Sequence, residues 1–150
     1  MDHKAFIDAN RERFLDELMQ WLRIPSVSSD PNSKEAMAQA AEYLKNRFIE
    51  QGVDKVEIYP TEGHPIVYAE KITDPSKPTV LVYGHYDVQP PDPLDLWDSP
   101  PFEPVIKKTE EHPEGAIYAR GSCDDKGQVY MHVKAFEIMA KDNDFPCNMK

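Results

Sequence analysis

The sequence predicts an α/β domain, a three-layer sandwich in which helices flank a mixed, largely parallel sheet. Two observations support this class. Apolar residues recur at helical spacing in three long segments, and short strand-like segments lie between these segments. The stretch TVLVYG, Thr79 to Gly84, is nearly all apolar, as expected of a central strand that helices cover on both faces.

Two helices are expected in the first third of the chain. The first covers residues 4–23 and ends before Ile24-Pro25, because a residue that precedes proline avoids the helical conformation. The second starts near Asn32 and Glu35, which have the spacing of a capping box, and it ends at Gly52. These helices account for the apolar periodicity of residues 4–52.

Strands are expected at residues 53–59, 66–72, 79–84 and 115–121, and a third helix at 125–141. The third helix should turn Val129, Val133, Phe136 and Ala140 inward. Six prolines between Pro90 and Pro104 exclude a regular strand there, since proline cannot donate a ladder hydrogen bond. The chain of 150 residues therefore forms one domain, or part of one.

Composition excludes several classes of function. The 27 acidic residues outnumber the 17 basic ones, so the chain lacks the positive surface that nucleic acid requires. No apolar run is long enough for a membrane span or a signal peptide, which predicts a cytoplasmic protein with no membrane partner. Two cysteines are too few for a disulfide framework, and we expect both to be thiols.

His85 and Asp87 follow the apolar stretch directly. The carboxyl ends of strands in open α/β sheets form ligand crevices, and side chains two residues apart in extended backbone point the same way. A metal-bound histidine usually gives its other ring nitrogen to a carboxylate, and H-x-D supplies such a pair. The alternative is a capping aspartate beside a hydrogen-bonded histidine, which is the more frequent interpretation of an isolated H-x-D.

Asp124 and Asp125 lie at the start of the third expected helix, where a helix N-terminus favours negative charge. Capping explains one carboxylate easily, but two adjacent carboxylates repel each other unless a cation neutralises them. Two cations about 3.5–4 Å apart, bridged by one carboxylate, would resolve this conflict. A plain helix cap remains the alternative for this pair.

Three motifs in order, "GHYDVQP", "WDSPPFEP" and "GAIYARGSCDDKG", resemble the signature of a co-catalytic metallopeptidase family. The family includes carnosine-type dipeptidases, carboxypeptidase G, acetylornithine deacetylase and succinyl-diaminopimelate desuccinylase. "LMQWLRIPSVSSDP" also resembles its first helix and the following turn, and the proline-rich insert is most similar to the dipeptidase branch. The resemblance implies a zinc-exopeptidase-like catalytic domain, of which residues 1–150 are the N-terminal portion.

The resemblance assigns roles residue by residue. His85 matches a ligand of one metal, and Asp87 matches the aspartate that orients its imidazole. Asp124 matches the carboxylate that bridges two metals, whereas Asp125 matches a neighbour that binds none. Lys126 matches a motif position that we interpret as structural, at the start of the helix. Two divalent metals are implied, with zinc as the first choice and manganese as the second.

The resemblance also implies what these residues leave out. The general-base glutamate and the remaining ligands follow the bridging aspartate in the family, so they are expected outside this chain, as are the rest of the catalytic domain and any lid or dimerisation domain. The full-length protein is therefore expected to be a homodimeric metallopeptidase that cleaves dipeptides with a metal-activated water. The piece 1–150 alone should be inactive.

Two alternatives remain open for function. One is an N-acyl-amino-acid deacylase or desuccinylase of the same family, so the substrate would be a dipeptide or a small N-acyl amino acid. The other is a non-catalytic fragment or binding module. Among other candidates, His132 is expected in the core and Cys123 as a buried small residue. The serines after the first helix, Ser26, Ser28 and Ser29, form no catalytic triad that the sequence supports.

Overall fold

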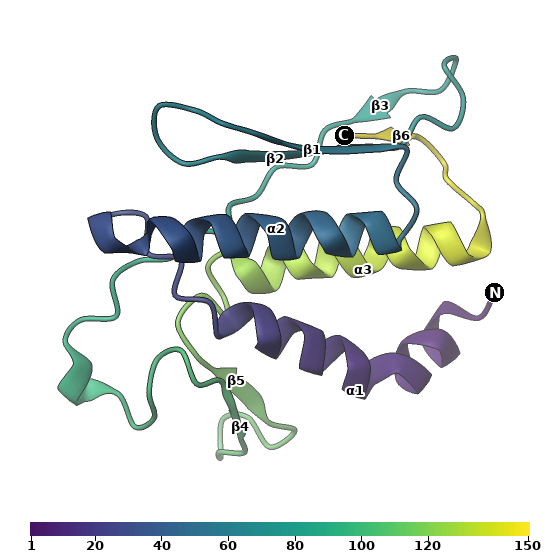
Figure 1. The fold of residues 1–150 in the computed structure, drawn as a ribbon. Helices are drawn as coiled ribbons and strands as arrows, with labels where there is room; N and C mark the ends of the chain where they lie inside the picture. Colours follow the sequence, from purple (N-terminus) through teal and green to yellow (C-terminus); the bar gives the residue numbers. More distant parts are fainter.

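A computed structural model describes all residues from Met1 to Lys150. The helices are α1 (His3–Leu22), α2 (Lys34–Glu50) and α3 (Lys126–Asp142), with short 3-10 helices at Pro31–Ser33 and Leu94–Leu96. The strands are β1 (Lys55–Tyr59), β2 (Ile66–Glu70), β3 (Thr79–Val80), β4 (Val105–Lys107), β5 (Ala116–Tyr118) and β6 (Asn148–Met149). In Figure 1, α2 and α3 lie between α1 and a layer of strands made of β1, β2, β3 and β6, called the strand layer below. The predicted α/β class is confirmed.

The three helices enclose the core. Its central cluster combines residues from each of them: Trp21, Ala40, Leu44, Tyr130 and Val133. The indole N–H of Trp21 also donates to the carbonyl of Ala40 at 3.1 Å, which ties α1 to α2. The expected capping box of α2 does not form. Instead, the Asp30 carboxylate accepts the backbone N–H of Asn32 and starts a 3-10 turn ahead of the helix.

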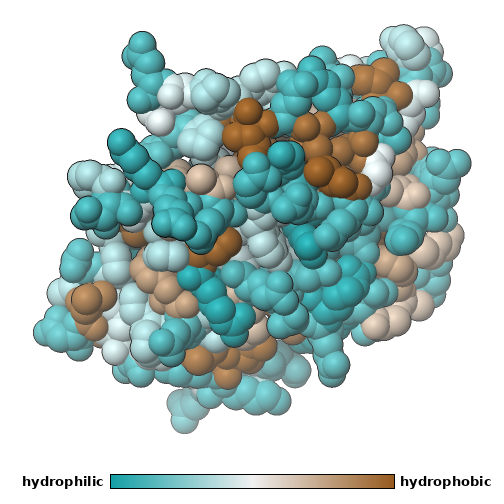
Figure 2. Space-filling view, in the orientation of Figure 1, coloured by the Kyte–Doolittle hydropathy of each residue, from teal (hydrophilic) through white to brown (hydrophobic).

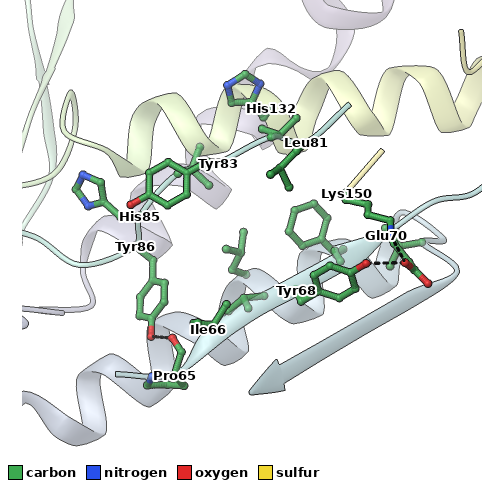
Figure 3. A pocket seen from close by; sticks show the side chains of 18 of the residues that line it. Pro65, Ile66, Tyr68, Glu70, Leu81, Tyr83, His85, Tyr86, His132 and Lys150 are labelled. Atoms are coloured by element: carbon green, nitrogen blue, oxygen red, sulfur yellow. Dashed lines mark hydrogen bonds and ion pairs between the residues drawn. The ribbon is translucent and has the colours of Figure 1, made fainter. Parts of the chain in front are cut away.

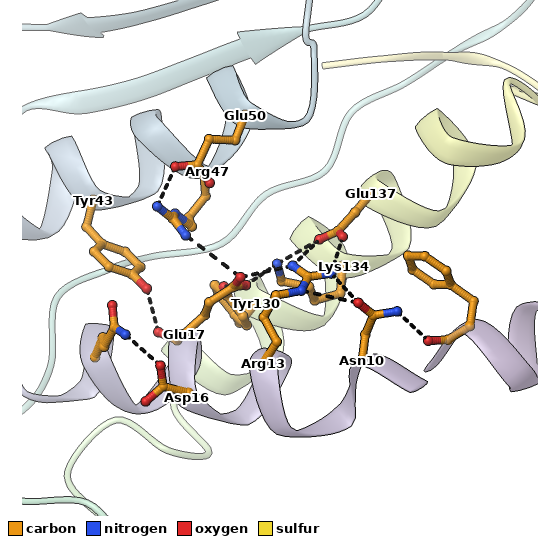
Figure 4. Close-up of polar contacts among 12 residues, drawn as sticks. Asn10, Arg13, Asp16, Glu17, Tyr43, Arg47, Glu50, Tyr130, Lys134 and Glu137 are labelled. Carbon is orange, nitrogen blue, oxygen red and sulfur yellow. Dashed lines mark hydrogen bonds and ion pairs between the residues drawn. The ribbon is translucent and has the colours of Figure 1, made fainter. Parts of the chain in front are cut away.

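Charged side chains are buried where α1 meets α3 (Figure 4). The Glu17 carboxylate accepts hydrogen bonds from Tyr130, at 2.6 Å, and from Lys134. Arg13 donates to Glu137 at 2.5 Å, and Lys134 donates to the same carboxylate at 2.9 Å. Burial raises the pKa of Glu17, but the bonds from Lys134, Tyr130 and Arg13 more than offset this and lower it to about 2. The predicted inward residues of α3 therefore share the interface with paired charges.

Strand pairing is mixed and comes in short pieces. β1 and β2 are antiparallel, and β6 is parallel to β3. Met149 of β6 also forms an antiparallel bridge with Lys71, just past β2, so β6 runs between β2 and β3. The helices cover one face of this layer (Figure 1).

The stretch predicted as a doubly covered central strand differs from the prediction. Only Thr79–Val80 is assigned as strand, and Leu81 and Tyr83 are 75% and 85% exposed. The physical reason is that the stretch has β6 as a neighbour only as far as Lys150, and no helix covers its outer face. Figure 2 shows hydrophobic residues reaching the surface in this layer.

A separate antiparallel hairpin, β4 and β5, lies at the opposite side of the helices from the strand layer (Figure 1). β4 was not predicted, because its three residues directly follow the proline-rich stretch and have no longer strand pattern of their own. The proline-rich loop before it is held by Trp97, whose indole N–H donates to the Pro91 carbonyl at 2.7 Å and whose ring lies under the Arg120 guanidinium. None of the helices combines the length and the apolar character needed to cross a bilayer.

Candidate metal centre

Gly84 lets the end of the apolar stretch pass directly over α3. A Cβ atom at this position would lie 2.4 Å from Val129 Cγ2 and 2.9 Å from Asp125 Oδ2, so any larger residue would push the chain away from the helix. Because of this close approach, the backbone N–H of His85 reaches Asp125 Oδ2 at 3.0 Å. Asp125 therefore holds the main chain of His85.

The imidazole of His85 is oriented by Asp87. Its Nδ1 lies 3.0 Å from Asp87 Oδ1 and 3.1 Å from the Asp87 carbonyl oxygen. Both partners are acceptors, so Nδ1 carries a hydrogen and donates. That leaves Nε2 as the nitrogen available to a ligand. This is the geometry expected of the H-x-D pair.

Asp124 faces the free nitrogen of His85, with Oδ1 at 3.1 Å from Nε2. Two atoms that both present lone pairs need a cation, either a proton on Nε2 or a metal, to lie this close. Two ligand atoms bonded at about 2 Å to one tetrahedral metal stand roughly 3.3 Å apart. The donor pair therefore fits a divalent cation by chemistry and by spacing.

The electrostatics of His85 agree with a site for positive charge. Burial lowers the pKa of His85, but hydrogen bonding to Asp87 and the negative charges of Asp87 and Asp125 outweigh it, and the pKa is raised. The Asp124 side chain is 72% exposed, so the site opens to solvent. No set of three or more His, Cys, Asp or Glu side chains is arranged to hold a metal in this chain. The structure brings His85 and Asp124 together, and their roles as metal ligands stay predictions.

The start of α3 argues against the plain capping alternative. Asp125 occupies the N-cap position, yet its side chain makes no capping hydrogen bond and instead accepts from His85. The peptide bond between Asp124 and Asp125 is cis. Neither carboxylate is used to cap the helix, so both are directed to the His85 segment.

Lys126 ties the N-terminal end of α3 to the end of α1. Its side chain is entirely buried, and Nζ donates to the carbonyls of Trp21 and Ile24 at 3.0 and 2.8 Å. Burial lowers the pKa of Lys126 to about 7, against the charge of Asp87. The residue following the aspartate pair thereby joins α3 to the end of α1, in agreement with the structural role expected of it.

Two sequence predictions near the site are wrong. His132 lies exposed on α3 rather than in the core, on the side of the helix that faces Leu81 and Tyr83 (Figure 3). Cys123 is exposed rather than buried, because it belongs to the same open loop as Asp124. Conversely, sequence reasoning missed Ser28, whose hydroxyl donates to Asp87 Oδ2. The only signal was its place in the turn after α1, residues 24–28 (the IPSVS turn).

A cavity of about 720 Å³ adjoins the site between β2, residues 81–84 and the helices (Figure 3). Its lining is mostly apolar and includes Val67, Leu81, Val129 and Phe136. Tyr86 closes one end by donating to the carbonyl of Pro65 at 2.5 Å. His85 and Asp87 line this end of the cavity.

Known proteins resemble this chain in sequence and in structure. The model of peptidase family M20/M25/M40 matches residues 81–149. The Cys-Gly metallodipeptidase dug1 of Schizosaccharomyces pombe is 32% identical over 95% of this chain and 31% of its own length. Beta-Ala-His dipeptidase of Mus musculus is 33% identical over 97% of this chain and 31% of its own length.

Solved structures agree. The dipeptidase Dug1p of Saccharomyces cerevisiae superposes with a TM-score of 0.82 at 30% identity, over 95% of this chain and 32% of that one. Human carnosine dipeptidase 1 also gives 0.82, at 27% identity, over 97% and 32%. The chain spans about a third of the length of the curated relatives it matches. It is thus related, in sequence and in fold, to the metallodipeptidases of peptidase family M20/M25/M40.

Proposed function

We propose that the protein containing these residues is a metal-dependent dipeptidase. The observation that carries the proposal is the convergence of His85 Nε2 and Asp124 Oδ1 at 3.1 Å, with Nδ1 of the same ring held by Asp87. The relatives named Cys-Gly metallodipeptidase and Beta-Ala-His dipeptidase support the reaction and the substrate class. A dipeptide is accordingly the substrate proposed.

Each residue has a distinct task in this proposal. His85 and Asp124 would hold zinc, or manganese as the second choice, since imidazole and carboxylate suit both ions. Asp124 Oδ2 makes no hydrogen bond in the chain, which leaves it free to bridge to a second metal. When bound, the metals polarise the scissile carbonyl and activate water. Asp87 holds the hydrogen on Nδ1, so Nε2 is the nitrogen that would bind a metal.

The general base and the other ligands are proposed to lie outside residues 1–150, which would then be the N-terminal portion of the catalytic domain of a homodimer. The coverage of the relatives supports this, because the chain spans about a third of the length of each.

The test uses the whole protein. After chelation and dialysis, hydrolysis of Cys-Gly and β-Ala-His should be lost and should return with zinc or manganese. His85→Ala and Asp124→Ala should each lose metal and activity, whereas Asp87→Ala should weaken metal affinity about 10–100-fold without changing the metal count. A fully active metal-free preparation, or an Asp124→Ala variant with normal rate and metal content, would overturn the proposal.

A second candidate is an N-acyl-amino-acid deacylase. It is favoured by the succinyl-diaminopimelate desuccinylase of Azoarcus, which is 42% identical over 62 residues. The same preparation assayed on an N-succinyl amino acid separates the two activities. Turnover of neither substrate class by the metal-loaded protein would point to a binding module.

A further inference from the structure

The IPSVS turn after α1 is fixed onto the segment that carries Asp87. Val27 and Val88 form a parallel bridge, in which the Val88 N–H donates to the Ser26 carbonyl at 2.9 Å. The buried Ser26 hydroxyl donates to the Tyr86 carbonyl at 2.7 Å. The main chains on either side of Asp87 are therefore anchored to this turn.

Ser28 contacts the carboxylate of Asp87 itself. Its hydroxyl donates to Oδ2, while Oδ1 accepts from Nδ1 of His85 at 3.0 Å. The two oxygens are thus held from opposite sides. The Ser28 main chain is also restrained, because Nε2 of His64, in the loop between β1 and β2, donates to its carbonyl at 2.8 Å.

We propose that Ser28 is a positioning residue for the metal centre, acting through Asp87 on His85. A carboxylate held at one oxygen can rotate and lengthen its bond to the imidazole, and the ring can then place its hydrogen on Nε2 instead. That hydrogen would occupy the lone pair needed by a metal. The effect on metal affinity rests on the proposed function, whereas the effect on the ring does not.

The experiment compares four forms of the whole protein, freed of metal by chelation and dialysis: wild type, Ser28→Ala, Ser28→Thr and Ser29→Ala. Ser29 is the matched control, since it is adjacent and exposed, and its side chain makes no hydrogen bond. Nitrogen-15 NMR of the histidine rings at alkaline pH, with His85 assigned from a His85→Gln spectrum, reports which ring nitrogen carries the hydrogen. Circular dichroism checks that each variant folds.

Because Asp124 Oδ1 lies 3.1 Å from Nε2, the metal-free ring is expected to carry a proton on Nε2 as well, so the signal of Nδ1 is the one to compare. We expect a hydrogen-bonded Nδ1–H in wild type, Ser28→Thr and Ser29→Ala, and partial loss of the hydrogen from Nδ1 in Ser28→Ala. Zinc affinity, measured by calorimetry, should fall about threefold to tenfold in Ser28→Ala, less than the about 10–100-fold of a direct histidine partner. Should Ser28→Ala fail to fold, Ser28→Cys replaces it, since a thiol of similar size is only a weak donor.

Unchanged ring signals in Ser28→Ala would overturn the proposal, and so would a Ser29→Ala effect of equal size. The two proposals fail separately. If the ring signals shift but wild type binds no zinc, the positioning role stands and the metal centre falls. If zinc binds and the ring signals do not shift, the metal centre stands and Ser28 has no positioning role.

Discussion

Where α1 meets α3, the buried carboxylates Glu17 and Glu137 are each paired with a cation, whereas the strand layer leaves Leu81 and Tyr83 largely in solvent. The charged interface joins α1 to α3, whereas β1 and β2 pack on α2. The helical side also contains the fully buried Trp21 and Val133. The strand side instead borders an apolar cavity.

The difference indicates where residues 1–150 obtain their stability. Between the helices the buried carboxylates Glu17 and Glu137 are each paired with a cation, so breaking one of these contacts should be costly. The strand layer buries little on its outer face, so changes there should alter association more than folding. The proposed metal centre lies between the end of the apolar stretch and the start of α3. The following changes test that contrast, from the largest expected effect to the smallest.

Glu17→Ala should produce the largest loss of stability. It would leave Lys134 and Arg13 without one of their carboxylates in a buried network, which typically costs about 3–5 kcal/mol. Urea unfolding followed by circular dichroism measures the change. Asp16→Ala, an exposed neighbour on the same helix, is the control and should stay within about 0.5 kcal/mol. Similar losses for the two variants would contradict the network's importance.

The same carboxylate predicts acid sensitivity of wild type. Its folded pKa of about 2 lies below the ordinary value of 4.5, so its contribution is fully present above pH 4.5 and disappears as pH falls through about 2. At about 1.4 kcal/mol per pKa unit, the contribution is roughly 3 kcal/mol. Urea midpoints across this range should fall more steeply for wild type than for Glu17→Gln. Parallel curves would argue against the low pKa.

Gly84→Ala tests the contact between the end of the apolar stretch and the start of α3. The added methyl group would press on Val129 and Asp125, and overpacking of this kind costs about 1–3 kcal/mol. Faster hydrogen exchange at the His85 amide should accompany the loss, because that amide donates to Asp125. Gly63→Ala is the control, since its nearest contact would be 3.8 Å away. A stable Gly84→Ala variant with a protected His85 amide would show that the helix can move aside.

Leu81→Ser and Tyr83→Ser should have the smallest effect on folding, within about 0.5 kcal/mol, because both side chains are mostly exposed already. They should instead reduce self-association of the chain, as seen by sedimentation velocity. Val133→Ala, on the buried side of α3, should by contrast lose about 1 kcal/mol or more. Equal losses on both sides would remove the contrast between the two layers.

Local sequence patterns predicted the helices to within a few residues, because apolar spacing and proline act over one or two turns. α1 was expected at residues 4–23 and spans His3–Leu22, and α3 was expected at 125–141 and spans Lys126–Asp142. The motifs also singled out His85, Asp87 and Asp124, which the structure brings together. Those residues were predictable because their chemistry is rare in that order along a chain.

What the tertiary structure alone decided involves contacts between distant elements. The buried pairing of Glu17 with Lys134 joins residues 117 positions apart, and Ser28 reaches Asp87 across 59. A carboxylate or a hydroxyl carries no local signal of the partner that it will meet after folding. The exposure of Leu81 and Tyr83 has the same origin, because an apolar strand is buried only where other segments cover it. Sequence therefore determined the helices, most of the strands and the candidate ligands, and the packing of those elements determined which polar groups hold the ligands in place.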